Sequence, residues 1–412
     1  MSAIEKPKLV VLGSGFAAFS LLKEIDTRLF EVTAVSPRNY FLFTPLLPST
    51  TVGTIEFRSI IEPVRKACPD VRYYQAICTS VDPERKQIIC EGAPDGTGFE
   101  LPYDVLVIGI GAVSNTYGIS GVKEHALFLK DLADARAIRQ RIIECFEQAA
   151  QPGTPEDQRK RILQFVVVGG GPTGVEFAAE MHDFLREDLE KAYPDLTPSV
   201  TIILLEATHQ ILSTFDATLG AYTMRLFRRQ RIQVRTGAPV VRVEEEKIVL
   251  RDGIEVPYGL LVWSTGVGPT DLANALPFSK DRGFRILTDD YFSVNGARGV
   301  YSIGDCAVIE GKDLPATAQV AQQEGRFLAQ HLRRLQRGRA IKPFRYRHYG
   351  MLAYVGSGKA LADLASFKGR GFSTWLFWRS AYLTRLVSLK NKVLVLFDWF
   401  KAFCFGRDIS RF

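Results

Sequence analysis

The N-terminal stretch that decides the fold reads Lys8-Leu-Val-Val-Leu-Gly13-Ser-Gly15-Phe-Ala-Ala18-Phe-Ser-Leu-Leu22. Its apolar residues run directly into a G-x-G-x-x-A turn, and helix-forming residues follow the turn. This pattern predicts a buried parallel strand, a tight turn and a helix whose N-terminal amide groups face an anion. Gly13 and Gly15 allow the backbone to approach a pyrophosphate, whereas Ala18 replaces a glycine that only governs helix–strand packing. The stretch is typical of a dinucleotide-binding domain, although a single such turn also occurs in other α/β folds.

A second strand is expected at Phe30–Val35, about twenty residues after the turn, where the ribose of a dinucleotide would lie. No acidic residue stands at its end, because the chain continues Ser36-Pro-Arg38. The first unit therefore lacks the carboxylate that often contacts a ribose.

A second copy of the pattern begins at Leu163–Val168 and continues Gly169-Gly-Gly171-Pro-Thr-Gly174-Val-Glu176 into a helical run. The next expected strand, Val200–Leu205, ends in Glu206. An acidic side chain there accepts hydrogen bonds from both hydroxyls of an adenosine ribose and repels a 2′-phosphate. Glu206 therefore favours NADH over NADPH.

A third segment, Gly299–Ala307, predicts a short strand that ends in Gly304-Asp305 and brings Asp305 to FAD. Two strand-then-glycine segments, Tyr103–Ala112 and Leu260–Gly268, read as the points where the chain crosses between domains. The order of these segments predicts an α/β protein with two Rossmann-like dinucleotide-binding domains, the fold of two-dinucleotide flavoproteins. We expect an FAD domain at 5–120 and 280–340, an NADH domain at 160–278 and a C-terminal membrane-associating region at 341–412.

The composition excludes several classes of protein. The chain has 412 residues, 46% of them hydrophobic, which is enough for more than one core. Its six cysteines form no CxxC pair and its five histidines no HExxH pattern, so we expect no disulfide framework, iron–sulfur cluster or metal site. We also expect no secretory signal, no transit peptide and no transmembrane helix.

The last 47 residues, 366–412, carry the charge asymmetry of the chain. They hold nine Lys or Arg against Asp398 and Asp408, an excess equal to the net charge of +7 of the whole chain. They also hold twelve of the 45 aromatic residues. Aromatic and aliphatic runs flanked by basic residues predict helices that lie in the headgroup plane of a membrane. A homodimer interface is compatible with this reading, whereas nucleic-acid binding is disfavoured because the rest of the chain is electrically balanced.

The electron acceptor must be inferred from the site, because the fold alone does not define it. Disulfide reductases need a redox-active cysteine pair beside the flavin, and no CxxC or CxxxxC is present. Two alternatives stay open at this point. One is a sulfide:quinone oxidoreductase that uses Cys145 and Cys306, and the other is a non-enzymatic sensor that binds flavin and NADH.

The chain resembles the type II (alternative) NADH:quinone oxidoreductases of the respiratory chain, especially their mitochondrial-type branch. The resemblance covers nearly the full length and rests on these stretches: Ser36–Pro48, Gly169–Glu176, Gly304-Asp305, the AQxAxQE match at Ala318–Glu324, Tyr349–Ser357 and Leu376–Leu383. It implies a flavoprotein that oxidises NADH through non-covalent FAD and reduces ubiquinone or another membrane quinone to quinol without pumping protons.

The resemblance also implies roles for individual residues. The FAD contacts would be Gly13, Gly15, Ser36, Thr44 and Asp305. The NADH contacts would be Gly169, Gly171, Gly174, Glu206 and Gly266. Glu176, in the first turn of the helix that follows the second glycine turn, would lie near the nicotinamide; its other reading is an acid that complements the helix dipole. Gln319 and Gln323 share one helix face and would meet the quinone carbonyl groups.

The expected location is a membrane surface. The short polar lead before Leu9 favours the cytoplasmic face of a bacterial inner membrane, with the mitochondrial inner membrane as the alternative. Water-borne NADH and a lipid-borne quinone would then reach the same flavin from different phases.

Overall fold

The computed structural model describes residues 5–93 and 95–410, which fall into two compact units. Within these ranges, unit 1 comprises residues 5–42, 62–113 and 267–348, and unit 2 comprises 43–61, 114–266 and 349–410. The chain passes between the units after Leu42, Ile61, Val113, Gly266 and His348, and two of these points, Val113 and Gly266, lie within two residues of the ends of the strand-then-glycine segments. The predicted FAD domain includes residues 43–61, which the structure groups with unit 2.

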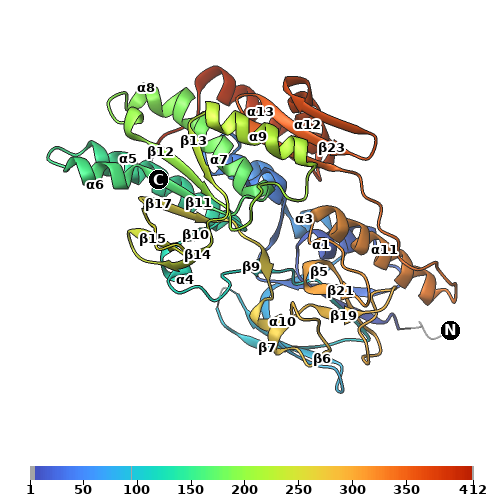
Figure 1. Cartoon of the computed structure of the whole chain (residues 1–412). Coiled ribbons are helices and arrows are strands. Elements are labelled where there is room, and N and C mark those ends of the chain that lie inside the picture. Colours follow the sequence, from blue (N-terminus) through green and yellow to red (C-terminus); the bar gives the residue numbers. More distant parts are fainter. Residues whose placement is uncertain (1–4, 94, 411–412) are drawn as a thin grey trace. The chain divides into compact units, whose positions relative to one another are not determined.

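Unit 1 is built on a seven-stranded sheet (Figure 1). Its strands, in spatial order, are β20 (Val300–Ser302), β8 (Val105–Ile108), β1 (Lys8–Leu12), β2 (Glu31–Ser36), β5 (Arg72–Asp82), β6 (Gln87–Gly92) and β7 (Gly98–Pro102). The first five are parallel, and β6 and β7 continue as an antiparallel meander. The parallel strands are apolar because both faces of a parallel sheet are covered.

Two helices of unit 1 pack side by side: α1 (Phe16–Glu24) and α11 (Ala318–Gln336). A Cβ atom on Gly325 would lie 2.1 Å from the carbonyl oxygen of Ala17, so only glycine allows this close approach. Other elements of unit 1 include β3 (Tyr40–Leu42), α3 (Val64–Ala67), β18 (Val267–Gly268), α10 (Asp271–Ala275), β19 (Ile286–Thr288), η5 (Gly304–Cys306) and β21 (Ala307–Ile309).

Unit 2 contains a second parallel sheet of five strands. Their spatial order is β10 (Leu127–Phe128), β17 (Leu260–Trp263), β11 (Gln164–Val168), β12 (Thr201–Leu205) and β13 (Ile232–Arg235). A small antiparallel sheet adds β14 (Val240–Val243), β15 (Lys247–Leu250) and β16 (Glu255–Pro257). The helices are α4 (Val122–His125), α5 (Leu132–Ala150), α6 (Glu156–Ile162), α7 (Pro172–Phe184), the π-turn η3 (Leu185–Leu189), α8 (Glu190–Ala192), the short η4 (Thr197–Ser199) and α9 (Ala217–Arg229).

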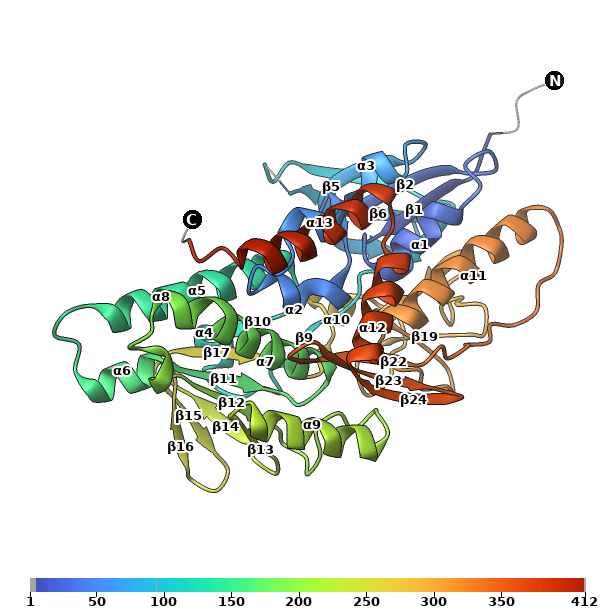
Figure 2. The ribbon, with the colours of Figure 1, turned by 90° about the horizontal axis from the view of Figure 1, so that it is seen from above.

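Two further parts of the chain complete unit 2. Residues 43–61 form η1 (Thr44–Leu46), α2 (Leu47–Thr50) and η2 (Phe57–Ile60). The C-terminal part forms an antiparallel sheet of β22 (Met351–Gly356), β23 (Lys359–Leu364) and β24 (Phe367–Gly371), followed by α12 (Phe372–Arg385) and α13 (Leu389–Phe405). Figure 2 shows α12 and α13 in red. No helix in the described ranges is both long and apolar enough to span a bilayer.

The predicted fold class is confirmed: each unit contains a parallel sheet that leads through a glycine turn into a helix. The C-terminal sheet was not predicted. Its strands are short and contain glycines at 356, 369 and 371, so their alternation is weak in the sequence.

Candidate functional site

The first glycine turn lies at the carboxyl end of β1. Gly13 has φ of 107°, and a Cβ atom on it would lie 2.2 Å from the carbonyl oxygen of Gly109. Gly15 caps α1 with no side-chain hydrogen bond, and a Cβ there would meet no atom within 4 Å. The first turn of α1 contains no acidic side chain. The turn is therefore a cradle that suits an anion, with open space in front of the helix amides.

Ser36 lies at the end of β2, beside this cradle. Its buried hydroxyl is 2.9 Å from that of Ser14, so it ties the second strand to the glycine turn. Because this hydroxyl is already shared, a direct contact between Ser36 and FAD stays a prediction. Thr44 opens η1 and belongs to unit 2, so its predicted FAD contact also stays a prediction.

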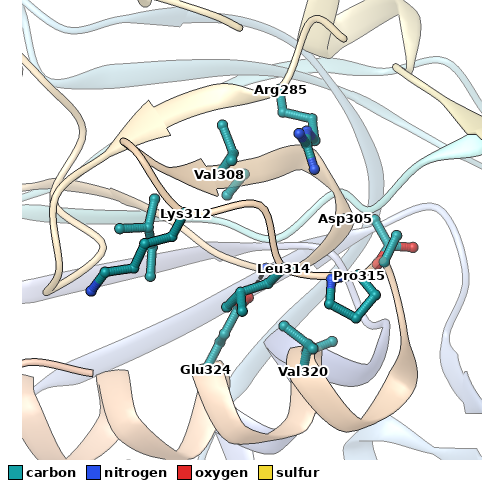
Figure 3. A pocket seen from close by; sticks show the side chains of 13 residues that line it. Arg285, Asp305, Val308, Lys312, Leu314, Pro315, Val320 and Glu324 are labelled. Carbon is teal, nitrogen blue, oxygen red and sulfur yellow. Dashed lines mark hydrogen bonds between the residues drawn. The ribbon is translucent and has the colours of Figure 1, made fainter. Parts of the chain in front are cut away.

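Gly304 and Asp305 lie beside the first turn of α1. A Cβ atom on Gly304 would be 3.0 Å from the Cβ of Ala17. Asp305 lines a pocket that also takes in β21, the chain before α11 and the N-terminal part of α11. In Figure 3, Val320 and Glu324 enter from α11, while Val308 enters from the strand above it. The structure thus brings Asp305 and the Gly13–Gly15 cradle together within one unit.

Glu324 is a site residue that sequence reasoning did not single out. Its carboxylate accepts the backbone N–H of Gly304 over 2.6 Å, and only 6% of the residue is exposed. Burial raises the pKa of Glu324 to about 7, the Gly304 N–H opposes this, and the charge of Asp305 adds to it. A signal was present, because Glu324 occupies the apolar face of α11 between Ala321 and Leu328.

The second glycine turn follows β11 in unit 2 and repeats the first in detail. Gly169 has φ of 113°, and a Cβ on it would lie 2.1 Å from the carbonyl oxygen of Ser264. A Cβ on Gly174 would lie 2.0 Å from the carbonyl oxygen of Gly169. Gly171 caps α7 without a side-chain hydrogen bond and has open space around its Cβ position. This second cradle suits a second pyrophosphate.

Glu206 lies against this turn, just after β12. One of its carboxylate oxygens accepts the N–H of Gly170 and the other accepts the N–H of Thr208, both over 2.7 Å. The backbone therefore fixes the carboxylate beside the cradle, at the position expected for a ribose. Gly266 follows β17, where its carbonyl oxygen accepts the N–H of Asn115 over 2.8 Å.

Glu176 occupies a different position from the one expected. We predicted it in the first turn of its helix, but α7 starts at Pro172, so Glu176 begins the second turn. The N-terminal amides of α7 are therefore not its partners. Instead, its carboxylate accepts the backbone N–H of Tyr354 in β22 over 3.0 Å. Burial raises the pKa of Glu176 to about 8, against the effect of the Tyr354 N–H and reinforced by the charge of Glu180.

Gln319 and Gln323 lie near the start of α11. The side-chain amide of Gln323 donates to the carbonyl oxygen of Arg347 over 2.8 Å and accepts the Arg347 N–H over 3.0 Å. Gln323 thus holds the chain that leads out of unit 1. For both glutamines, a contact with quinone stays a prediction.

The cysteines named for the sulfide alternative are both buried. Burial raises the pKa of Cys145 and that of Cys306 to about 11, which disfavours the thiolate that sulfide chemistry needs. The structure also shows a pair that the spacing did not reveal, because Cys78 and Cys90 face each other across β5 and β6. All six cysteines are free thiols, and five of them are buried.

The residues of unit 1 fit FAD. The cradle at Gly13 and Gly15 leaves the α1 amides uncapped by any side chain, and Asp305 lies beside the same helix turn. Uncapped amides suit a pyrophosphate, and a nearby carboxylate suits hydroxyl donors.

Comparisons with known proteins agree with this geometry. Residues 7–325 match the family described as pyridine nucleotide-disulphide oxidoreductase, and residues 348–408 match the NDH2 C-terminal domain. The chain belongs to the type II NADH:quinone oxidoreductase family. A member named probable NADH dehydrogenase, from Dictyostelium discoideum, is 46% identical over 99% of this chain and 92% of its own length.

Two other relatives in the family extend the comparison. The internal alternative NAD(P)H-ubiquinone oxidoreductase A1, mitochondrial, of Arabidopsis thaliana is 42% identical over 99% of this chain and 86% of its own length. The solved structure of NDH2 from Plasmodium falciparum in complex with NADH superposes with a TM-score of 0.94 at 28% identity. It covers 98% of this chain and 100% of its own.

Proposed function

We propose that this chain performs the reaction of its family at a membrane surface, where it oxidises NADH through FAD and reduces a quinone dissolved in the bilayer. The observation that carries the proposal is the pair of glycine cradles, one in each unit, each opening onto a helix N-terminus without a side-chain cap. Two dinucleotides in one chain are what hydride transfer from NADH to a flavin requires. When bound, FAD supplies the step that accepts a hydride and passes on two electrons.

The residues of the chain position the reactants and hold protons. Amides of α1 and α7 bind the two pyrophosphates, and Glu206 binds the adenosine ribose of NADH. Glu176, with its pKa raised to about 8, carries a proton at neutral pH on a carboxyl oxygen. Because quinol formation consumes two protons, Glu176 is our candidate proton-holding group. Gln319 and Gln323 are our candidates for the quinone carbonyl groups, since an amide meets a neutral ring without adding charge.

The proposed contact with a membrane is supported by α13. Some of its polar side chains face the protein interior, whereas a row of its apolar side chains is exposed. Its inward side chains include Asn391, which donates to the carbonyl oxygens of Ser59 and Ile61, and Asp398, which accepts the N–H of Glu56. The opposite face of α13 is exposed and apolar. It consists of Leu389, Val393, Leu396, Phe397, Phe400 and Phe403, which are 49–88% exposed. Such a face is costly in water and favourable in an acyl layer.

The basic residues of the C-terminal segment contribute less to membrane binding than the sequence suggested. Lys368 pairs with Asp216, Lys401 with Glu56, and Arg407 with Glu187 and Asp188. In the described part of the tail, Arg385, Lys390 and Lys392 form no ion pair and remain for anionic lipid. At ~1 kcal/mol each, they orient the protein, while the phenylalanines supply most of the affinity. The membrane is the inner membrane of a bacterium or a mitochondrion, and the Arabidopsis thaliana relative is named as mitochondrial.

Steady-state kinetics of the purified protein in lipid test the proposal. We expect NADH-dependent reduction of several quinones, and unchanged rates in Cys145→Ser and Cys306→Ser, which separate it from sulfide oxidation. Reduction of ferricyanide without reduction of any quinone would contradict the proposal. Fast flavin reduction followed by no reoxidation with any acceptor would instead indicate a sensor.

A further inference from the structure

Arg379 lies in an apolar groove between α12 and α13. The groove has a volume of about 350 Å³ and is lined by Leu376, Arg379, Ser380, Leu383, Leu396, Trp399, Phe400 and Phe403. Among the described residues that line the groove, Arg379 alone is charged. The groove opens on the exposed apolar face of α13, because Leu396, Phe400 and Phe403 belong to both.

The guanidinium of Arg379 lies between two indole rings. Its central carbon is 3.9 Å from the ring centroid of Trp375 and 4.6 Å from that of Trp399. These rings hold the cation in place through cation–π attraction, but they accept no hydrogen bond from its edge. Its Nε atom is buried and has no hydrogen-bond partner, and no carboxylate within the described ranges pairs with it. Burial lowers the pKa of Arg379 from its ordinary value.

Arg379 therefore lacks a hydrogen-bonded anion, although the charge of Glu180 acts on it. A buried N–H group without an acceptor costs about 1–3 kcal/mol, and more when it is charged. Arginine is suited to phosphate, because its planar fork can donate two parallel hydrogen bonds. The walls around it are mostly leucine, phenylalanine and tryptophan, which suit acyl chains, and the Ser380 hydroxyl already donates to the carbonyl oxygen of Leu376.

We propose that the groove between α12 and α13 binds one anionic phospholipid, with its phosphate on Arg379 and its acyl chains along Leu383, Leu396 and Phe403. This inference rests on the proposed membrane seating and goes beyond it, because it assigns one site, one lipid and a fixed stoichiometry. A general surface attraction would need neither the groove nor the stacked guanidinium.

A second copy of the chain fits the groove less well. Two identical α12–α13 faces in a twofold contact would bring the same residues together. From Phe372 to Phe405 these helices carry five Lys or Arg and one acid, Asp398, which is 4% exposed and bound to the N–H of Glu56. Such a contact would place cation against cation and would leave Arg379 without a carboxylate.

The test is retention of lipid by the full-length, FAD-loaded protein. The protein is bound to vesicles of phosphatidylglycerol and phosphatidylcholine and extracted into mild detergent, and native mass spectrometry counts the phospholipid left per polypeptide. Wild type should keep one phosphatidylglycerol. Arg379→Gln should lose it, with affinity at least tenfold lower, and Arg379→Lys should keep it in part, because the charge remains without the fork.

Arg385→Gln is the matched control, because it removes the same charge from the exposed end of the same helix. Both glutamine variants should bind whole vesicles about fivefold more weakly, but only Arg379→Gln should lose the retained lipid. Flavin content and circular dichroism establish that each variant is folded. Rates with NADH and a short-chain quinone in detergent should not change in either variant.

Three outcomes would overturn the lipid site. The first is equal lipid retention in Arg379→Gln and Arg385→Gln. The second is Arg379-dependent binding of inorganic phosphate without retention of phosphatidylglycerol, which would indicate a free anion. The third is a change in the monomer–dimer equilibrium of Arg379→Gln with no lipid on wild type, which would indicate a second copy. If wild type bound no anionic vesicles at all, the seating itself would be wrong, which is a separate result.

Discussion

The backbone N–H of Tyr354 donates to the carboxylate of Glu176, so a strand near the C-terminus covers an acid that begins the second turn of α7. The next acids on the same helix face, Glu180 and Asp183, are also buried. Ser49 and Thr54 donate to Glu180, while the Tyr354 hydroxyl and the Ser357 N–H donate to Asp183. A row of acids that would face solvent on an isolated helix is thus satisfied by residues from two distant parts of the chain.

The stability of unit 2 should depend on the protonation of Glu176. Its pKa is raised from 4.5 to about 8, so the folded protein keeps this proton while the unfolded chain loses it above about pH 4.5. The contribution of Glu176 to stability is therefore greatest below that pH and is lost as pH rises to about 8. Relative to Glu176→Gln, wild type should lose up to roughly 5 kcal/mol across this window.

Urea unfolding of both proteins at about pH 5, 7 and 9 measures this difference, with exposed Glu190→Gln as the control. Parallel stability curves for wild type and Glu176→Gln would show that the carboxyl is not protonated at neutral pH.

Glu206 should set the choice of nucleotide. Glu206→Gln removes the charge that repels a 2′-phosphate but keeps an oxygen that can accept the Gly170 N–H. We expect the ratio of kcat/KM for NADH to that for NADPH to fall at least tenfold, because a charged hydrogen bond of about 1.5–3 kcal/mol is lost. An unchanged ratio would refute the ribose assignment.

The two glutamines of α11 should differ in their effects. Gln319→Ala should raise KM for the quinone roughly fivefold, as expected for one hydrogen bond of about 1 kcal/mol, and leave reduction of ferricyanide by NADH intact. Gln323→Ala also removes both hydrogen bonds to the backbone of Arg347, so it should reduce thermal stability as well. Identical quinone kinetics in Gln319→Ala and wild type would remove Gln319 from the quinone site.

Arg407 should hold the C-terminal segment against the rest of unit 2. Its side chain is 8% exposed and donates to Glu187 over 2.7 Å and to Asp188 and Thr54 over 2.8 Å. Arg407→Gln leaves buried Asp188 without a cation and should cost roughly 3–5 kcal/mol in denaturant unfolding. The control Arg186→Gln breaks an exposed pair with Glu190 and should cost under about 1 kcal/mol. An equal loss of unfolding free energy in the two variants would count against this role of Arg407.

The exposed phenylalanines of α13 should carry the membrane affinity. Replacing Phe400 and Phe403 together by serine removes about 3 kcal/mol or more of apolar burial, which corresponds to a roughly hundredfold weaker partition into vesicles. Co-sedimentation with phosphatidylglycerol vesicles measures it. Ile77→Ser, at a 51% exposed position of β5 in unit 1, is the matched control. Partition that persists in the double variant would place the membrane contact elsewhere.

The sequence by itself determined both dinucleotide cradles, because each is local: apolar strand, glycine turn and helix are contiguous in the chain. It also singled out Glu206, which directly follows β12, and Asp305, which lies three residues after the end of β20. The same argument could not find Glu324, whose partner Gly304 lies twenty residues earlier.

Only the tertiary structure decided which charges are available. The nine basic residues of the tail look equivalent in sequence, yet Arg407 is buried in ion pairs, Arg379 is stacked between indoles and Arg385 is exposed. Likewise, the position of Glu176 gives no sign that Tyr354 will cover it. The physical reason is that the pKa of a charged group, and its availability to a ligand, depend on how deeply it is buried and on which groups it contacts. Most of those partners, such as Glu187 and Asp188 for Arg407 and Trp399 for Arg379, are supplied by other segments of the chain that meet only when it folds.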